Sequence, residues 1–105
     1  MKPYAYVIVR KDLPPVQIVV QACHAAYEAG LAFEDPVDTS SIILLMVPDQ
    51  AALEEAAKRL DRYKVGHRMF YEPDFGPMGN SALATRPLTR KKERFLFANY
   101  EKLSM

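Results

Sequence analysis

The sequence contains only one cysteine, four glycines and no long apolar run. A single cysteine excludes an intrachain disulfide framework and favours a reducing compartment. No stretch approaches the roughly 20 apolar residues that a membrane span needs, so we expect no membrane contact. The apolar run at residues 4–9 is too short for a signal peptide, and these absences together predict a cytoplasmic protein.

Several signatures of enzyme chemistry are also missing. Two histidines and one cysteine without ligand spacing give no zinc signature, so we expect no metal site. Gly76 and Gly79 follow no strand-to-helix turn, which argues against a phosphate-binding loop. Cys23 and His24 are adjacent and would point about 100° apart on a helix, so they cannot act as a thiol and its base. Cys23 is expected in the core, and a Ser-His-Asp triad has no motif in its favour.

The net charge of +1 conceals an uneven distribution. Residues 12–57 hold eight acidic residues and no lysine or arginine, whereas residues 58–94 hold ten basic and four acidic residues. One part of the surface should therefore be positive, which suits a polyanionic partner. Basic residues near 58–64 can equally serve as a solvated surface, and the run at 90–94 is the better candidate for a binding patch.

The stretch at residues 16–29 predicts a helix with an unusual surface. Pro14 and Pro15 suit its first turn, Asp12 can cap it, and Gly30 can end it. Its polar side chains follow one line along the helix, at Gln17, Gln21, His24 and Glu28. The other sides are apolar and require burial against a sheet and a second body. The polar line is then either the solvent-facing side, which the sequence alone favours, or the wall of a site.

The whole chain of 105 residues is expected to form one domain, residues 1–105, and periodicity divides the rest of it into elements. Apolar runs predict strands at residues 4–9, 41–47, 67–71 and 81–85. A helix is expected at 50–63 with Asp49 as its N-cap, and a last helix from Thr89 to about Leu103. This order predicts an α/β protein with a mixed four-stranded sheet, in which the first three strands are parallel and the last is antiparallel.

Ligands of such sheets bind beyond the carboxyl ends of the parallel strands. Arg10, Lys11 and Asp12 leave the first strand at that edge, and the loop with Asp74 leaves the third. The polar line begins there as well. Asp74 lies between Pro73 and Phe75, where a dry setting would raise its pKa and suit a general acid or base, although it can equally form a turn. His24 can likewise be structural or catalytic.

Two motifs resemble the type II peptidyl-tRNA hydrolase family of archaea and eukaryotes. Residues 9–13, Val-Arg-Lys-Asp-Leu, resemble the turn that follows the family's first strand, and residues 21–26, Gln-Ala-Cys-His-Ala-Ala, resemble its Gln-x-x-His-Ala helix. Further similarity follows in order at residues 47–49, at Asp74 in a glycine-containing loop, and at residues 81–87. The similarity spans nearly the whole chain, and the Gln-x-x-His-Ala segment is its most specific part.

The resemblance implies a three-layer α/β/α domain, a homodimer, and hydrolysis of the ester that joins a peptide to the 3′ end of tRNA, without a cofactor. Family members use a lysine just before the Gln-x-x-His segment and an aspartate in the loop before the last strand. Asp74 matches that aspartate, and Ser81 stands where the family often has threonine. Gln17 occupies the lysine position, in a turn about two residues shorter than usual. An amide carries no charge to stabilise an oxyanion, and such a loss can cost ~10²-fold in rate, unless Lys11 or Arg10 substitutes.

The first hypothesis is a divergent hydrolase of peptidyl-tRNA or a related acyl ester. Asp74 would position or activate water, while Gln17, Gln21 and His24 would bind the substrate end or orient Asp74. The predicted substrate-binding residues are Arg10, Lys11, Asp12, Gln21, Ser81, Arg86, Arg90, Lys91 and Lys92. The second hypothesis is a non-catalytic module that binds tRNA, a nucleotide or a protein partner, and the third is a small dimeric protein with an unrelated small-molecule pocket.

Overall fold

The computed structural model describes residues 2–34 and 38–103. The elements in chain order are β1 (Tyr4–Arg10), α1 (Pro15–Ala32), β2 (Ser41–Val47), α2 (Gln50–Arg62), β3 (His67–Glu72), the short 3-10 helix η1 (Gly76–Met78), β4 (Gly79–Thr85), the 3-10 helix η2 (Lys91–Phe97) and β5 (Glu101–Lys102). No helix in these two ranges is long and apolar enough to cross a membrane.

The strands form one mixed sheet in the order β3-β4-β1-β2-β5. β1 pairs in parallel with β2, and β4 is antiparallel to both β1 and β3. The first three strands therefore share one direction and β4 returns against them, as expected from the helical crossovers. The sheet has five strands rather than the expected four, because β5 pairs antiparallel with β2.

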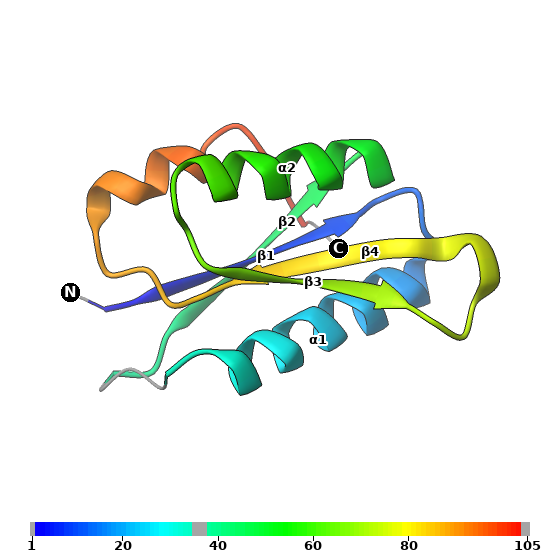
Figure 1. Cartoon of the computed structure of the whole chain (residues 1–105), viewed down its shortest axis with the longest axis horizontal. Helices are drawn as coiled ribbons and strands as arrows, with labels where there is room; N and C mark the ends of the chain where they lie inside the picture. The colour runs from blue at the N-terminus through cyan, green and yellow to red at the C-terminus, as the bar shows by residue number, and fades with distance from the viewer. Residues whose placement is uncertain (1, 35–37, 104–105) are drawn as a thin grey trace.

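Helices lie on both sides of this sheet (Figure 1). On one side, α1 packs through Ala22, Ala25 and Ala29 against alanines of β4 and valines of β1. These small side chains allow the helix to approach the sheet closely. On the other side, α2 packs through Leu53 and Leu60 in a larger cluster that also contains Leu96 and Phe97 of η2.

Helix α1 differs from its prediction at both ends. It runs through Gly30 as far as Ala32, so Gly30 does not end it. Asp12 does not cap it; its carboxylate accepts two hydrogen bonds from the Arg10 guanidinium, each at 2.9 Å. Pro14 at the N-cap and Pro15 at the first helical position set the helix entry instead, because neither needs an amide donor there.

The predicted last helix, from Thr89 to Leu103, is wrong. The chain forms η2 and then turns into the two-residue strand β5. Leu96 and Phe97 are both buried, and Phe97 stacks on Tyr6 with ring centroids 3.8 Å apart. After η2 the chain pairs with the open edge of β2, where Leu103 N–H donates to Leu44 O.

The N-cap of α2 gives a stability prediction. The Asp49 carboxylate accepts a hydrogen bond from Ala52 N–H at 2.9 Å, as expected from the sequence. Asp49→Ala leaves that amide without its partner and should lower the free energy of unfolding by about 1 kcal/mol. Asp49→Asn keeps an oxygen acceptor and should retain most of the stability. Urea unfolding followed by circular dichroism measures both; equal stability of the alanine variant and the wild type would contradict the cap's role.

Candidate functional site

Three elements meet at one end of the sheet. The first turns of α1, the end of β3 and the start of β4 lie together there (Figure 1). α1 packs on both β3 and β4, and the loop from residue 73 to residue 78 connects these strands at the same end. The polar line of α1 therefore begins at the sheet edge that the sequence predicted as a site.

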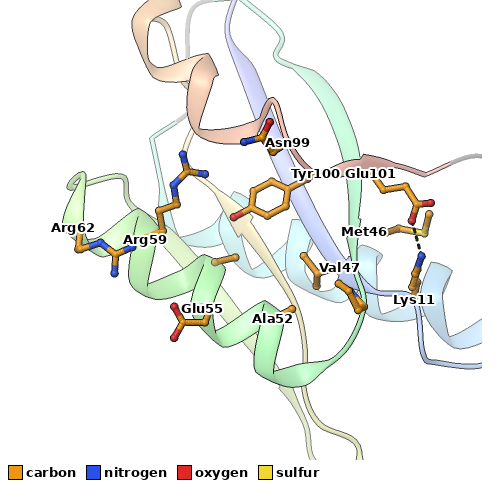
Figure 2. A pocket seen from close by; sticks show the side chains of 12 residues that line it. Lys11, Met46, Val47, Ala52, Glu55, Arg59, Arg62, Asn99, Tyr100 and Glu101 are labelled. Atoms are coloured by element: carbon orange, nitrogen blue, oxygen red, sulfur yellow. Dashed lines mark hydrogen bonds and ion pairs between the residues drawn. The ribbon is translucent and has the colours of Figure 1, made fainter.

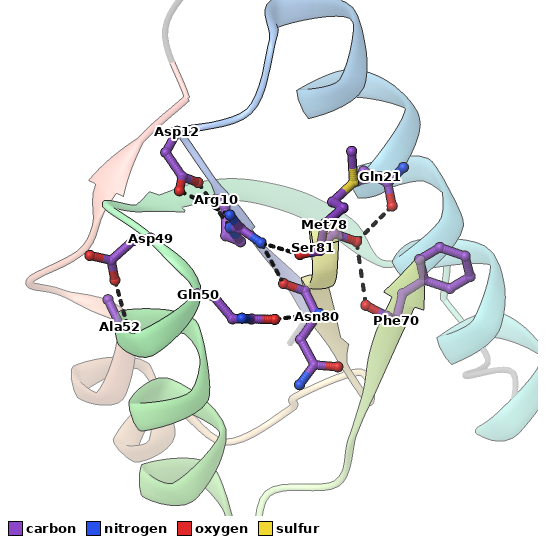
Figure 3. A network of polar contacts seen from close by, with 10 residues as sticks. All are labelled: Arg10, Asp12, Gln21, Asp49, Gln50, Ala52, Phe70, Met78, Asn80 and Ser81. Carbon is purple, nitrogen blue, oxygen red and sulfur yellow. Dashed lines mark hydrogen bonds and ion pairs between the residues drawn. The ribbon is translucent and has the colours of Figure 1, made fainter. Parts of the chain in front are cut away.

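A buried amide is the centre of this region. Gln21 is fully buried, and its side-chain Nε2 donates to Gln17 Oε1 at 3.0 Å and to Glu72 Oε1 at 2.8 Å. Its Oε1 accepts a hydrogen bond from Ser81 Oγ at 2.6 Å (Figure 3). Both donors of the amide and one of its acceptor positions are thus satisfied inside the protein. The polar line is therefore not the solvent-facing side of α1 at Gln21; it faces β3 and β4.

Ser81 reaches Gln21 because β4 is irregular at that residue. Phe70 pairs with Ala82 while Tyr71 pairs with Asn80, so Ser81 is the extra residue in the pairing of β3 with β4. A bulge of this kind redirects a side chain relative to the regular alternation. The Ser81 hydroxyl lies 2.6 Å from Gln21 Oε1 and 3.3 Å from Phe70 O, and the shorter contact is the stronger bond.

Glu72 is the acidic residue that contacts the amide row, and the sequence interpretation placed it only in a loop. It is the last residue of β3 and is buried. The Gln21 amide, the backbone N–H of Asp74 at 3.2 Å and the nearby His24 ring all favour its ionised form, and they hold the pKa of this carboxyl below its ordinary value of 4.5 despite its burial. The signal was available: Glu72 lies two residues after Phe70, so both side chains point to the α1 side of the strand.

Asp74 and His24 border this buried network at the surface. Asp74 is exposed, and its backbone amide ties the loop to Glu72. His24 is also exposed, and its ring stacks on Phe70 with centroids 4.4 Å apart and an interplanar angle of 1°. The structure therefore brings the loop of Asp74 to the start of α1, and the carboxylate bonded to Gln21 is that of Glu72.

The two cations that leave β1 serve other partners. Arg10 pairs with Asp12 and donates to the backbone oxygens of Met78 and Asn80, so it braces the loop before β4 (Figure 3). Lys11 instead pairs with Glu101 at 3.1 Å (Figure 2). With these partners, neither Arg10 nor Lys11 takes the place of the lysine that the resemblance leads one to expect at the position of Gln17.

The remaining predicted basic residues lie at the other end of β4. Arg86 follows the last residue of this strand, whereas Ser81 is near its start. At about 3.3 Å per residue, this separates Arg86 from the buried amide by roughly 15–20 Å. Arg86 pairs with Glu93 at 3.0 Å, and the side chains of Arg90, Lys91 and Lys92 are exposed. The structure therefore does not bring these four residues together with Gln17 and Gln21.

A separate cavity of about 620 Å³ lies between α2 and the C-terminal segment (Figure 2). Lys11, Arg59 and Tyr100 are among its lining residues. Because Lys11 faces this cavity, it is turned away from the amide row. In residues 2–34 and 38–103, no group of three His, Cys, Asp or Glu side chains is placed to hold a metal ion.

Comparisons with known proteins bear on the fold only. No family model and no curated protein matches the chain. Among solved structures, the chain is similar to a protein of unknown function from Agrobacterium tumefaciens strain C58, with a TM-score of 0.75, 13% sequence identity and 99% of each chain covered. A likeness at this identity supports the arrangement of helices and strands and says nothing of activity.

The buried carboxylate predicts a pH-dependent contribution to stability. Because the folded pKa of Glu72 is below its ordinary value, its contribution is present near neutral pH and is lost as the pH falls through the folded pKa. Glu72→Gln should therefore be less stable than the wild type at pH 7, and the gap should narrow on acidification below about 4.5. Urea unfolding between pH 7 and pH 3 tests this, with Glu55→Gln on the exposed face of α2 as the control. A difference in unfolding free energy between Glu72→Gln and the wild type that does not change with pH would contradict the ionised state of Glu72.

Proposed function

We propose that this protein is a divergent hydrolase of the ester between a peptide or acyl group and tRNA. The observation that supports the proposal is the meeting of Gln17, Gln21 and His24 with an ionised carboxylate beneath the loop that carries Asp74. The exposed imidazole of His24 and the exposed carboxylate of Asp74 are groups that general acid-base chemistry on an ester uses, and the Gln17 amide can donate a hydrogen bond. The family resemblance at Gln21, His24 and Asp74 supports the same reaction.

Each residue has a separate part in the proposed reaction. Glu72 holds the Gln21 amide in one orientation. The Gln21 amide nitrogen in turn donates to the side-chain oxygen of Gln17 and holds that residue in place. This leaves the Gln17 amide nitrogen to donate to the carbonyl of the substrate ester. Asp74, exposed above the network, positions the attacking water, and His24 contacts the substrate end beside it. A neutral amide stabilises an oxyanion less than an ammonium does, so we expect a slow enzyme.

The tRNA and a homodimer belong to the same proposal. Arg86, Arg90, Lys91 and Lys92 would contact phosphates at the far end of β4, while the acylated 3′ end reaches the amide row. A polyanion can make both contacts because it extends over the whole sheet. The proposal also includes a three-layer α/β/α arrangement like that of the family, and a role in translation.

The alternative is a non-catalytic module that binds tRNA, a nucleotide or a protein partner on the same fold. One observation favours it: Arg10 and Lys11 are bonded elsewhere, so neither supplies the missing charge beside Gln17. Binding of tRNA without cleavage of the ester would distinguish this alternative from the hydrolase.

The activity is testable with an N-acetylated aminoacyl-tRNA. Release of free tRNA by the wild type should exceed the buffer rate, and Asp74→Ala should lower it by about 10²-fold or more, because the water loses its positioning group. Asp38→Ala, at another exposed aspartate, should leave the rate unchanged. Absence of turnover at high protein concentration would overturn the hydrolase and leave the binding module.

The basic residues are tested by the salt dependence of tRNA binding. Replacement of Arg90, Lys91 and Lys92 by alanine should weaken binding, because fewer phosphates are neutralised. The slope of log affinity against log salt should fall by about 1 for each phosphate that the variant no longer binds. Lys58→Ala and Lys64→Ala, on and just beyond α2, serve as controls that keep the slope. An unchanged slope in the triple variant would place the tRNA elsewhere.

A further inference from the structure

The cavity between α2 and the C-terminal segment has no part in the proposed reaction. It lies on the α2 side of the sheet, whereas the buried amide of Gln21 faces β3 and β4 from the α1 side. β2 and α2 give the cavity an apolar lining of Met46, Val47, Ala52 and Ala56. The two alanines are small, so a space of about 620 Å³ stays open beside α2. A cavity of this size, with an apolar lining and a few charged side chains, is typical of a small-molecule site.

Two arginines lie at one end of this cavity. Arg59 and Arg62 are three residues apart near the end of α2, so they share one face of the helix. Arg59 is partly buried, and its Nη1 donates to Leu96 O at 2.7 Å, which holds the guanidinium in place and leaves its other donors available. Within the described part of the chain, neither arginine forms an ion pair with a carboxylate. The two guanidinium groups therefore offer their donors to an anion.

Tyr100 lies across the cavity between its two ends. Figure 2 shows its ring between the arginines on one side and Lys11 with Glu101 on the other, with the hydroxyl directed toward the arginines. The backbone fixes this position, because Tyr100 N–H donates to Phe97 O and the next residue, Glu101, pairs with Met46 of β2. The ion pair of Lys11 with Glu101 also ties this segment to the end of β1. A ring that is held in this way is a surface on which a second aromatic ring stacks well.

The charges that line the cavity favour a ligand with one negative charge. The lining has three cations, Lys11, Arg59 and Arg62, and two carboxylates, Glu55 and Glu101, so its net charge is +1. A carboxylate balances this charge, whereas a phosphate monoester carries about −1.5 to −2 at pH 7. The planar fork of a guanidinium also matches the two oxygens of a carboxylate.

We propose that this cavity binds a small aromatic carboxylate. Its carboxylate group accepts hydrogen bonds from Arg59 and Arg62, and its ring stacks against Tyr100 over the alanines of α2. The cavity extends along α2 from Ala52 to Arg59, seven residues or about 10 Å at the helical rise, which suits a molecule of one or two fused rings. The inference stands without the hydrolase proposal, because neither Asp74 nor the amide row lines the cavity.

Isothermal titration calorimetry with 2-naphthoate tests the site. The wild type should bind this planar carboxylate saturably, with one site per chain. Arg62 is exposed at the end of α2, so Arg62→Gln removes one cation and keeps the fold. The loss of a charge-assisted hydrogen bond should raise the dissociation constant by about 10-fold or more. Arg68→Gln, at an exposed position of β3 outside the cavity, should bind like the wild type. The proposal is overturned if the wild type does not bind at millimolar 2-naphthoate, or if the two variants bind equally well.

Three analogues separate the parts of the ligand. 2-Naphthamide keeps the rings without the charge and should bind about 10-fold more weakly or worse, since no ionised acceptor faces the arginines. Decahydro-2-naphthoate keeps the charge without the aromatic face and should also bind more weakly than 2-naphthoate. 2-Naphthyl phosphate should bind no more tightly than 2-naphthoate. Undiminished affinity for either of the first two compounds, or tighter binding of the phosphate, contradicts an aromatic carboxylate as the ligand.

The position of the ligand is measured by two-dimensional NMR of the ¹⁵N-labelled chain during the same titration. Amide signals of residues 52–62 and 99–101 should shift on addition of 2-naphthoate, while those of Gln17, Gln21 and Asp74 should stay in place. Tyr100→Leu keeps an apolar side chain without an aromatic face and should weaken binding, with the β5 signals retained. Shifts confined to the amide row and the loop of Asp74 would move the ligand to the proposed hydrolase site and overturn the inference.

Discussion

The burial of one amide fixes the rotation of α1 about its axis, and both surfaces of this helix follow from it. Gln21 is held from three directions by Gln17, Glu72 and Ser81. Turning the helix so that Gln21 reached water would take the amide partner away from a buried carboxylate and a buried hydroxyl, which is costly in an apolar interior. With Gln21 directed at the sheet, the valines and Tyr27 on the opposite side must face outward, and so does Cys23, which we expected in the core.

The same rotation explains why sequence patterning misjudged this helix. Amphipathic analysis places polar residues toward water, and for α2 it succeeds: Leu53 and Leu60 are buried, and Asp49 caps the first turn. In α1 it fails at Gln21, which is buried because its amide completes a network with Glu72 and Ser81, two residues far away in the sequence, while the valines on the opposite side are exposed. No local pattern carries that information, and only the excess of apolar residues around α1 indicated a second body.

Strands were predictable where their sequences are uniformly apolar and were missed or misjudged where pairing is irregular. β2 has the bounds expected from its apolar run, and the direction of the first three strands follows from their crossovers. The bulge that directs Ser81 toward Gln21 depends on the partner strand, so it cannot be predicted from the residues of β4 alone. β5 is equally hidden, since two charged residues, Glu101 and Lys102, form it by pairing with an open edge. The candidate site could therefore be located from the sequence, but its buried acid was missed because the predicted strand ended at residue 71, one residue before Glu72.

The charge distribution sets a condition on any polyanion that uses this site. The end of the sheet near α1 carries an ionised Glu72 and an exposed Asp74, and the cation nearest to them along β1, Arg10, is neutralised by Asp12. Phosphates close to the amide row would be repelled by these carboxylates. The exposed basic surface after β4 lies roughly 15–20 Å away, a distance that the strand rise of about 3.3 Å per residue imposes. A polyanion that reached both ends of β4 would therefore be attracted by the basic residues at one end and repelled by the carboxylates at the other, so an uncharged group suits the amide row better than a phosphate does.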